Sequence, residues 1–362
     1  MKSRHKDNLI KFYKNKKIFI TGHSGFKGSW LTFVLSLFGS KIVGYSLKPR
    51  FKPSNFELLN LKKTIKKNYF CDIRNKKKLN IALIRAKPDI IFHLAAQPLV
   101  KRSYLDPVET FETNINGTLN VLEASKNLKS IKSLVIITSD KCYKNNEKKS
   151  GYKETDELGG YDPYSGSKAA VENVFHSYYN AKFKHRKKIG VVSARAGNVI
   201  GGGDWSNYRL IPDFIKSLMK NKQFEIRSPN SVRPWQHVLD LINGYLILGM
   251  KSYGNNKFNG SWNFGPYSKR SMKVIEIVMR LKKHLKVKKP LKIKRNKSLK
   301  ETNLLFLNSK KSLKYLKWKP KFTILKSIDL TSIWYQEYLK NKLKNFIIYD
   351  SRCNYFKKKT IY

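Results

Sequence analysis

Short apolar runs recur along the first two hundred residues, and each is followed by a longer stretch whose apolar positions fall three or four residues apart. The short runs predict strands at 18–20, at 41–47, just before Asp72, at 89–97, at 134–139 and at 191–195. The longer stretches predict helices, such as the one at 116–127. Because strands alternate with helices, the pattern predicts an α/β fold with a doubly wound parallel sheet.

Size and composition narrow the class of protein. The 362 residues can bury a large core in two lobes, and the hydrophobic content of 41% is ordinary. No run of eighteen apolar residues predicts a membrane-spanning helix, and the start of the chain is too polar for a signal peptide. The three cysteines are far apart and predict neither a disulfide framework nor a zinc site, and no other metal-ligand spacing is present. We therefore expect a cytoplasmic protein without a metal or a membrane partner.

The chain is strongly basic, with 75 Lys and Arg against 24 Asp and Glu and a formal net charge of +51. Such a charge is compatible with nucleic-acid binding. However, the basic residues are spread over nearly the whole chain and most are Lys, which, like the abundant Asn, Ile, Phe and Tyr, has A/T-rich codons. We therefore favour compositional drift over a nucleic-acid surface, whose place would be the basic stretch at 280–300. The positive field would favour an anionic small substrate.

Three glycines, in the pattern Gly22-x-x-Gly25-x-x-Gly28, connect the first predicted strand to the helix that follows. Gly22 permits a tight turn, Gly25 lets the backbone approach a pyrophosphate, and Gly28 allows the helix to pack closely on the strand. The free N–H groups at the start of the helix would hold the phosphates. Because strand, glycines and helix follow one another in this order, they predict a Rossmann-type dinucleotide-binding domain.

The end of the second predicted strand leaves the choice of dinucleotide open. NAD-binding folds usually place an acid there for the ribose hydroxyls, whereas this chain has Ser46, Lys48 and Arg50. Lys and Arg suit the 2′-phosphate of NADP, so both cofactors are physically possible. After the third strand, Asp72 and Ile73 are placed to flank an adenine.

Tyr164 and Lys168 are candidates for proton transfer. They lie four residues apart in a predicted helix, so their side chains share one face. A tyrosine with a pKa of about 10 is a poor base at neutral pH, but a neighbouring lysine cation lowers that pKa. Ser139, Asp140 and Lys141 stand where the fifth predicted strand ends, and open α/β sheets bind their ligands at such ends. The two groups together predict a catalytic site at this edge of the sheet.

Ser139, Tyr164 and Lys168 match the catalytic triad of the extended short-chain dehydrogenases/reductases, which the chain resembles. Five stretches resemble the sugar-nucleotide 4,6-dehydratases of that family, in particular those that act on CDP-glucose: TGHSGFKGSWL, HLAAQPLV, TSDKCY, GNVIGGGDW and RPWQHVLD. The resemblance extends from about Phe12 to the C-terminal region. It implies a lyase that converts CDP-glucose to CDP-4-keto-6-deoxyglucose with a retained NAD.

The resemblance also gives Asp140 and Lys141 separate roles. In these dehydratases the hexose is oxidised at C4, loses the C5 proton and the 6-hydroxyl as water, and is reduced at C6. Because the 4-keto group acidifies C5–H, the elimination needs a base near C5 and an acid near O6. Lys141 is expected to be the base and Asp140 the acid. The dTDP-glucose enzymes have Glu where Lys141 stands, and the CDP-glucose group has Lys.

Further residues match functional positions of the family one by one. The expected cofactor contacts, besides Tyr164 and Lys168, are Gly22, Gly25, Phe26, Gly28, Asp72, Ile73, Leu94, Ala95 and Ala96. The expected substrate contacts are Gln97, Asn198, Arg209, Arg233 and Asn263. The residues expected to pack in the core without a chemical role are His93, Trp235 and His237.

The predicted organisation has a large and a small part. The predicted ranges are a Rossmann domain at 12–199 with a return segment at about 234–265, a smaller substrate-binding lobe at 200–233 and 266–345, and a tail at 346–362. The resemblance implies a homodimer or homotetramer, joined through helices at about 107–127 and 163–182. It also implies a role in making dideoxysugars for lipopolysaccharide O-antigen.

Three alternatives stay open. A UDP-sugar 4-epimerase would share the fold and the triad but has no need of Asp140 and Lys141. An inverting UDP-N-acetylglucosamine 4,6-dehydratase also pairs Asp with Lys but usually lacks the spacing of Tyr164 and Lys168. A basic RNA-binding protein would explain the charge but not the motifs, and its affinity would fall steeply with salt.

Overall fold

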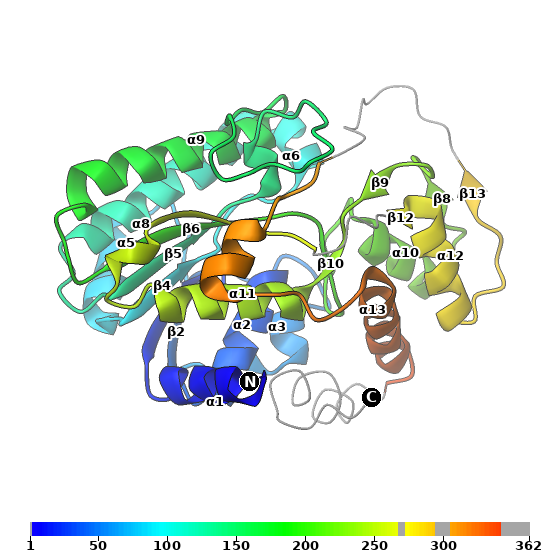
Figure 1. Ribbon diagram of the computed structural model, residues 1–362. Coiled ribbons are helices and arrows are strands. Elements are labelled where there is room, and N and C mark those ends of the chain that lie inside the picture. Colours follow the sequence, from blue (N-terminus) through cyan, green and yellow to red (C-terminus); the bar gives the residue numbers. More distant parts are fainter. Residues whose placement is uncertain (1, 267–271, 294–304, 342–362) are drawn as a thin grey trace.

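A seven-stranded parallel sheet forms the centre of the larger lobe (Figure 1). The structure is a computed structural model that describes residues 2–266, 272–293 and 305–341. Within them the strand order is β11-β6-β5-β4-β1-β2-β3, and every neighbouring pair is parallel. The strands are β1 (Lys17–Thr21), β2 (Lys41–Ser46), β3 (Lys67–Phe70), β4 (Ile90–His93), β5 (Ser133–Ile137), β6 (Gly190–Ala196) and β11 (Gly260–Phe264). The predicted doubly wound α/β fold is confirmed.

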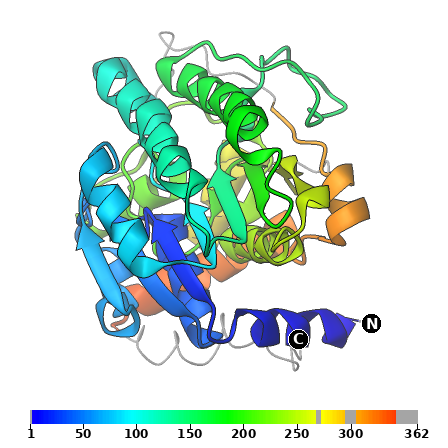
Figure 2. The same cartoon turned by 90° about the vertical axis from the view of Figure 1, so that its left-hand side faces the viewer.

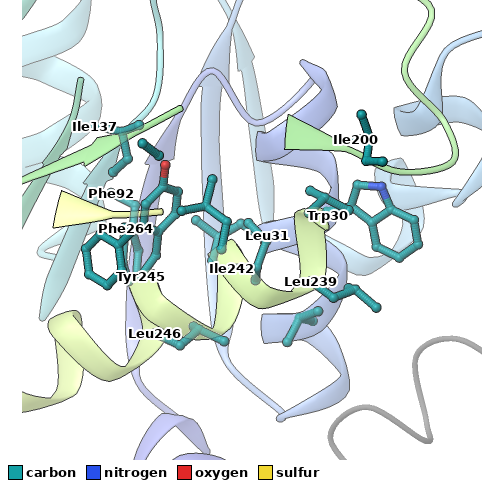
Figure 3. Packing of buried hydrophobic residues seen from close by; sticks show 14 of the residues in the cluster. Trp30, Leu31, Phe92, Ile137, Ile200, Leu239, Ile242, Tyr245, Leu246 and Phe264 are labelled. Atoms are coloured by element: carbon teal, nitrogen blue, oxygen red, sulfur yellow. The ribbon is translucent and has the colours of Figure 1, made fainter. Parts of the chain in front are cut away.

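Helices cover both faces of this sheet (Figure 2). One face carries α1 (Lys2–Tyr13), α2 (Phe26–Leu37) and α11 (Val238–Lys251), and the other carries α5 (Lys76–Ala86), α8 (Gly117–Lys126) and α9 (Pro163–Tyr178). Because side chains alternate along a strand, Ile18 and Ile20 join the cluster on the α2 face, whereas Phe19 joins the cluster on the α5 face. Figure 3 shows part of the first cluster. Strands buried on both faces explain why the sequence reads as unbroken apolar runs.

Some predicted boundaries differ from the structure for local reasons. The strand predicted at 89–97 ends at His93, because the N–H groups of Leu94 and Ala95 turn to the Thr21 hydroxyl. The strand predicted at 134–139 ends at Ile137, and Ser139 already caps the short helix η2 (Asp140–Cys142). The helix predicted at 116–127 begins earlier. It continues α7 (Pro107–Phe111) and η1 (Glu112–Asn116) into α8.

A smaller group of elements lies beside the carboxyl edge of the sheet, at the right of Figure 1. It contains α10 (Leu210–Met219), α12 (Val274–His284), α13 (Ile324–Leu339) and the two-stranded pairs β8 (Glu225–Ile226) with β13 (Lys292–Ile293) and β9 (Val232–Arg233) with β12 (Met272–Lys273). These elements fall in the ranges expected for the substrate-binding lobe, whose boundaries stay predictions. The tail expected at 346–362 lies outside the described residues.

The long connection from η2 to α9 is held by chain that returns from the smaller lobe. The backbone N–H of Tyr152 donates to the carbonyl of Phe306 (2.7 Å), and that of Asn308 donates to the carbonyl of Tyr152 (2.8 Å). Cys142 and Tyr143 pack with Tyr152 and with two leucines of the returning chain. The segment that carries Asp140 and Lys141 is therefore fixed from the side of the smaller lobe.

The remaining short elements connect the parts described above. They are α3 (Asn55–Leu58), α4 (Leu61–Thr64), α6 (Val100–Leu105), η3 (Tyr179–Phe183), β7 (Val199–Ile200), β10 (Gln236–His237), η4 (Asn256–Phe258) and η5 (Ser312–Leu316). Among the described residues, no helix is both long enough and apolar enough to span a lipid bilayer.

Candidate active site

The glycine turn between β1 and α2 has the shape that a dinucleotide needs. Gly22 has a φ of +72°, and a Cβ there would lie 2.7 Å from the backbone nitrogen of Ala95. A Cβ on Gly28 would lie 2.0 Å from the Gly22 carbonyl oxygen, so helix and turn touch. Gly25 caps α2 without a side chain, and the first turn of the helix contains no acid. The start of this twelve-residue helix can therefore receive a pyrophosphate, and the residues present fit a bound dinucleotide.

The end of β4 is built around Thr21. Its hydroxyl oxygen accepts hydrogen bonds from the N–H groups of Leu94 (3.1 Å) and Ala95 (3.2 Å), which places these residues and Ala96 beside the glycine turn. The side chain of His93 contacts the Thr21 hydroxyl group. Its Nδ1 contacts Thr21 Oγ1 (2.7 Å), its Nε2 contacts Thr118 Oγ1 (3.0 Å), and burial lowers its pKa to about 3. His93 is thus packed in the core, as expected from the sequence.

Asp72 and Ile73 lie where β3 ends, next to the expected adenine site. The carboxylate of Asp72 accepts hydrogen bonds from the backbone and guanidinium of Arg74. Ile73 is buried, and a Cβ on Gly117 would lie 2.7 Å from one of its methyl groups. The side chain of Asp72 is therefore directed to Arg74, while Ile73 supplies the apolar surface.

The structure brings the five expected catalytic residues together: Ser139, Asp140 and Lys141 follow the carboxyl end of β5, and Tyr164 and Lys168 lie in the first part of α9. Ser139 Oγ donates to Asp140 Oδ1 (2.8 Å), and Ser139 also lies close enough to the Tyr164 hydroxyl to influence its pKa. Lys168 Nζ lies 5.9 Å from the centre of the Tyr164 ring. Lys141 is half-buried next to them. The spacing read from the sequence is confirmed as a spatial cluster, while the role of each residue stays a proposal.

Burial shifts the acid–base properties of this cluster. It raises the pKa of Tyr164 to about 12, although the neighbouring Ser139 side chain acts in the opposite direction. Burial lowers the pKa of Lys168 to about 8 and raises that of Asp140 above its usual range. A buried carboxyl with a raised pKa suits a general acid, and a lysine with a lowered pKa beside a phenol suits a proton relay.

Lys27 is a charged residue at this site that was not singled out in the sequence. Lys27 lies in the first turn of α2, where burial and the charge of Arg209 lower its pKa to about 8, while Asp140 and Asp204 act in the opposite direction. A cation at the positive end of a helix is unfavourable unless an anion is close. The available signal was the lysine between Phe26 and Gly28 in an otherwise apolar and small motif.

Arg209 is an expected substrate residue that interacts electrostatically with the catalytic group. It stands at the start of α10, its Nη1 donates to Asp204 Oδ2 (2.9 Å), and its charge acts on Tyr164. Asn198 is half-buried in the connection after β6, and Arg233 is in β9. All three lie on the side of the smaller lobe.

Gln97 and Asn263 have their side chains engaged within the protein. The amide nitrogen of Gln97 donates to Leu99 O (3.1 Å) and Thr110 Oγ1 (2.9 Å). Asn263 is fully buried, accepts from the Tyr143 hydroxyl (2.8 Å) and donates to Tyr152 O (2.8 Å). Both side chains bond to backbone groups near the site. Their contacts with the substrate stay predictions. Within the described ranges, no group of His, Cys, Asp and Glu is arranged to hold a metal ion.

The family model and the two relatives described next are all named as sugar-nucleotide 4,6-dehydratases. The family model described as GDP-mannose 4,6 dehydratase matches residues 19–331. The chain is 39% identical over 336 residues to CDP-glucose 4,6-dehydratase of Salmonella typhimurium, covering 91% of this chain and 93% of that protein. It is 31% identical over 264 residues to dTDP-D-glucose 4,6-dehydratase of Dictyostelium discoideum, covering 69% and 59% respectively.

Solved structures share the fold at lower identity. UDP-glucose 4-epimerase of Thermotoga maritima with UDP-glucose has a TM-score of 0.77 at 21% identity, covering 89% of this chain and 99% of that one. The dTDP-glucose 4,6-dehydratase of Bacillus anthracis in complex with NAD has a TM-score of 0.73 at 23% identity, covering 91% and 98%. These structures share the overall fold of this chain.

Proposed function

The chain belongs to the GDP-mannose 4,6-dehydratase family, and on that premise we propose that it converts CDP-glucose to CDP-4-keto-6-deoxyglucose and water. One observation carries the proposal. The acid and amine of Asp140 and Lys141 lie beside the Ser139, Tyr164 and Lys168 cluster, on a segment that is fixed between the lobes. The 39% identity to a CDP-glucose enzyme over nearly the whole chain supports CDP-glucose as the substrate.

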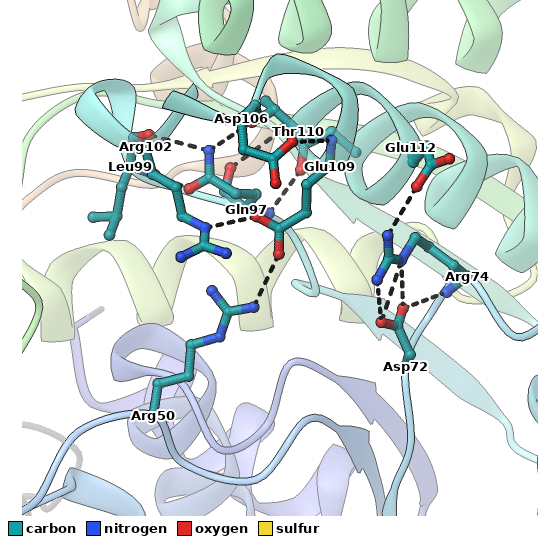
Figure 4. Close-up of polar contacts among 11 residues, drawn as sticks. Arg50, Asp72, Arg74, Gln97, Leu99, Arg102, Asp106, Glu109, Thr110 and Glu112 are labelled. Carbon is teal, nitrogen blue, oxygen red and sulfur yellow. Dashed lines mark hydrogen bonds and ion pairs between the residues drawn. The ribbon is translucent and has the colours of Figure 1, made fainter. Parts of the chain in front are cut away.

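NAD is the cofactor that fits this site best, and it would supply a reversible two-electron oxidation of the sugar. The glycine turn, the ends of β4 and β3 and the start of α2 would hold it. Arg50, which by sequence could have received the 2′-phosphate of NADP, contacts Glu109 Oε1 (3.3 Å), and Glu109 Oε2 accepts from Arg102 (2.6 Å) (Figure 4). Since Arg50 has a carboxylate partner already, this contact supports NAD over NADP.

Oxidation at C4 requires removal of the proton from the C4 hydroxyl. Tyr164 is placed to accept it, and Ser139 is placed to hydrogen-bond the same oxygen. Because burial raises the pKa of Tyr164 to about 12, the phenolate needs positive charge close by. The Lys168 ammonium, one helical turn away, supplies that charge.

Elimination of water then uses the two neighbouring residues. The C4 carbonyl acidifies C5–H, so a base can remove that proton. Lys141 takes the C5 proton, Asp140 donates a proton to O6, the C6–O bond breaks, and a C5–C6 double bond forms as water leaves. Reduction at C6 and return of a proton to C5 complete the product. The raised pKa of buried Asp140 favours the protonated acid that this step needs.

The nucleotide and the reaction type are tested together by incubating the protein with CDP-, dTDP-, UDP- and GDP-glucose and measuring 4-keto-6-deoxy products. We expect turnover with CDP-glucose to exceed the others by at least an order of magnitude. If another nucleotide sugar is turned over faster to its 4-keto-6-deoxy product, the protein is a 4,6-dehydratase with a different substrate. Conversion of UDP-glucose to UDP-galactose without loss of water would replace it by a 4-epimerase.

We also propose a homodimer that is joined through α6, α7 and α9. Large apolar side chains are exposed on α6 and α7: Tyr104 (56%), Leu105 (73%), Val108 (65%) and Phe111 (39%). A patch of this kind on a folded chain marks a protein contact, and a two-fold axis lets the same patch meet itself.

The proposed physiological role is synthesis of dideoxysugars for lipopolysaccharide O-antigen in the cytoplasm. It rests on the relation to the CDP-glucose enzyme. Loss of dideoxyhexoses from the surface polysaccharide of a strain that lacks this protein would support the role, and an unchanged polysaccharide would contradict it.

A further inference from the structure

We propose that Glu172, held by Arg195, is a positioning residue for the oxidation at C4: it fixes α9 against the segment that carries Asp140 and Lys141, and its charge keeps Lys168 cationic. The role rests on the proposed function, because it concerns the same reaction. Neither residue was singled out from the sequence. Both are almost entirely buried, at 0% and 1% side-chain exposure.

Glu172 stands one helical turn after Lys168 on α9, on the same face of the helix. Its carboxylate accepts hydrogen bonds from Thr138 Oγ1 (2.5 Å), Ser193 Oγ (2.9 Å), Arg195 Nη2 (2.7 Å) and Ser261 Oγ (3.0 Å). Thr138 directly precedes Ser139. The carboxylate therefore connects the helix of the proton-accepting tyrosine to the start of the catalytic segment.

Arg195 connects the same carboxylate to the far end of that segment. Its Nη1 donates to the Tyr143 hydroxyl (2.8 Å) and to Glu154 O (3.0 Å), and its guanidinium lies 5.0 Å from the centre of the Tyr143 ring. Thr138 and Tyr143 flank residues 139–142 on both sides. The pair thus holds both ends of the segment against α9, while both of its side chains are buried.

Stability alone does not explain such a pair. Removing two charges from water costs several kcal/mol per ion, and well-packed apolar residues often stabilise a core as well. Burial raises the pKa of Glu172, but Arg195 and the hydroxyl donors outweigh burial and keep the carboxylate ionised. A permanent negative charge is therefore maintained one turn from Lys168.

Lys168 needs that charge because its own surroundings favour the neutral amine. Burial lowers its pKa to about 8, and Glu172 acts against this effect. The other titratable groups that interact with it are Tyr164 on the same helix, Cys142 of η2, His93 of β4 and Lys27 of α2. His93 is kept neutral and Lys27 adds positive charge, so neither of them stabilises the ammonium.

The test is Glu172→Gln, which keeps the size of the side chain and removes its charge. A lysine that must be cationic loses activity as the pH rises through its pKa. Because the variant lowers that pKa, the basic limb of the kcat profile should move by about one pH unit to lower pH. The rate loss should grow towards roughly tenfold above pH 8, since a displacement of one pKa unit corresponds to a limiting factor of ten. KM for CDP-glucose should change little, because the Glu172 side chain is fully buried.

Matched variants separate charge from structure. Ser193→Ala and Ser261→Ala each remove a hydrogen bond to the same carboxylate and keep the charge, so the pH profile should stay in place. Glu172→Gln/Arg195→Met removes both charges and the unpaired guanidinium. It should regain thermal stability relative to Glu172→Gln but keep the displaced basic limb. This double variant also keeps the test usable if Glu172→Gln alone does not fold.

Two outcomes would overturn the inference: a pH profile unchanged in the folded Glu172→Gln or double variant, or a pH-independent loss that the double variant restores. Titration of the Lys168 ammonium by NMR compares the pKa of Lys168 in wild type and variant without a measurement of activity. A shift in that titration with no 4-keto product from the wild type would contradict the proposed function alone.

Discussion

Asp140 and Lys141 are adjacent in sequence but differ in environment. Asp140 is 5% exposed and bonded to Ser139, whereas Lys141 is half-buried and its backbone N–H donates to Ser139 Oγ (3.2 Å). Both residues lie in the short helix η2, and consecutive residues of a helix do not face each other. An acid and a base can therefore act on neighbouring carbons of one sugar without neutralising each other.

The division of roles predicts different effects of two substitutions. Lys141→Ala should still permit oxidation at C4 but should slow exchange of the C5 proton with deuterated solvent by about 10²–10⁴-fold, the usual contribution of a positioned base. The exchange is measured by NMR of the sugar.

Asp140→Asn is the matched comparison. It should leave C5 exchange measurable while slowing the loss of water from C6. If Lys141→Ala exchanged the C5 proton at the wild-type rate, Lys141 would not be the base, and another residue would have to remove that proton.

At the level of single residues, the sequence predicted the functional residues that belong to local motifs. It missed the residues whose role depends on burial among distant segments. The glycine pattern and the interval from Tyr164 to Lys168 are local, so they were readable. The ionised Glu172, the position of Lys27 and the inward bonds of Asn263 depend on segments far apart in the chain. No local pattern reports such partners.

At the level of elements, the strand and helix order was predictable because the sheet is buried on both faces. Boundaries were less predictable, since the N–H of Leu94 turns to Thr21 after β4 and Ser139 already caps η2 after β5. The exposed apolar side chains of α6 and α7 gave no sequence signal, because an apolar position in a helix looks the same whether it meets the core or a partner.

The proposed dimer predicts the effect of one charge on these helices. Leu105→Glu, at a side chain that is 73% exposed, should convert the dimer to a monomer in sedimentation or light scattering while the fold is kept. Met279→Glu is the control, because Met279 is 53% exposed but lies on α12 of the smaller lobe. A wild-type monomer, or a dimer that Leu105→Glu leaves intact, would contradict this interface.

At the level of the whole molecule, three buried histidines make stability depend on pH. Burial lowers the pKa of His23 to about 4 and the pKa values of His93 and His237 to about 3. The folded state keeps them neutral, whereas the unfolded chain binds protons below its ordinary pKa of about 6.5. Their stabilising effect is therefore present above pH 6.5 and is lost as the pH falls towards 4.

This linkage is measurable by urea unfolding. From about pH 7.5 to 5.5, each such histidine should lower the free energy of unfolding by roughly 1.4 kcal/mol, or about 4 kcal/mol for the three. His237→Gln should reduce the dependence on pH, and replacement of the exposed His185 should not. Equal free energies of unfolding at the two pH values would contradict the buried neutral state.

In the proposed reaction the hydrogen that leaves C4 of the sugar returns to C6 of the same molecule. Isotope tracing measures this transfer directly. CDP-glucose with deuterium at C4 is incubated with the protein in ordinary water, and the product is analysed by NMR. We expect CDP-4-keto-6-deoxyglucose with the deuterium in its C6 methyl group, and, for unlabelled substrate in deuterated water, one solvent deuterium at C5. Deuterium returned to C4 of an epimer, or lost from the sugar, would contradict the proposed reaction.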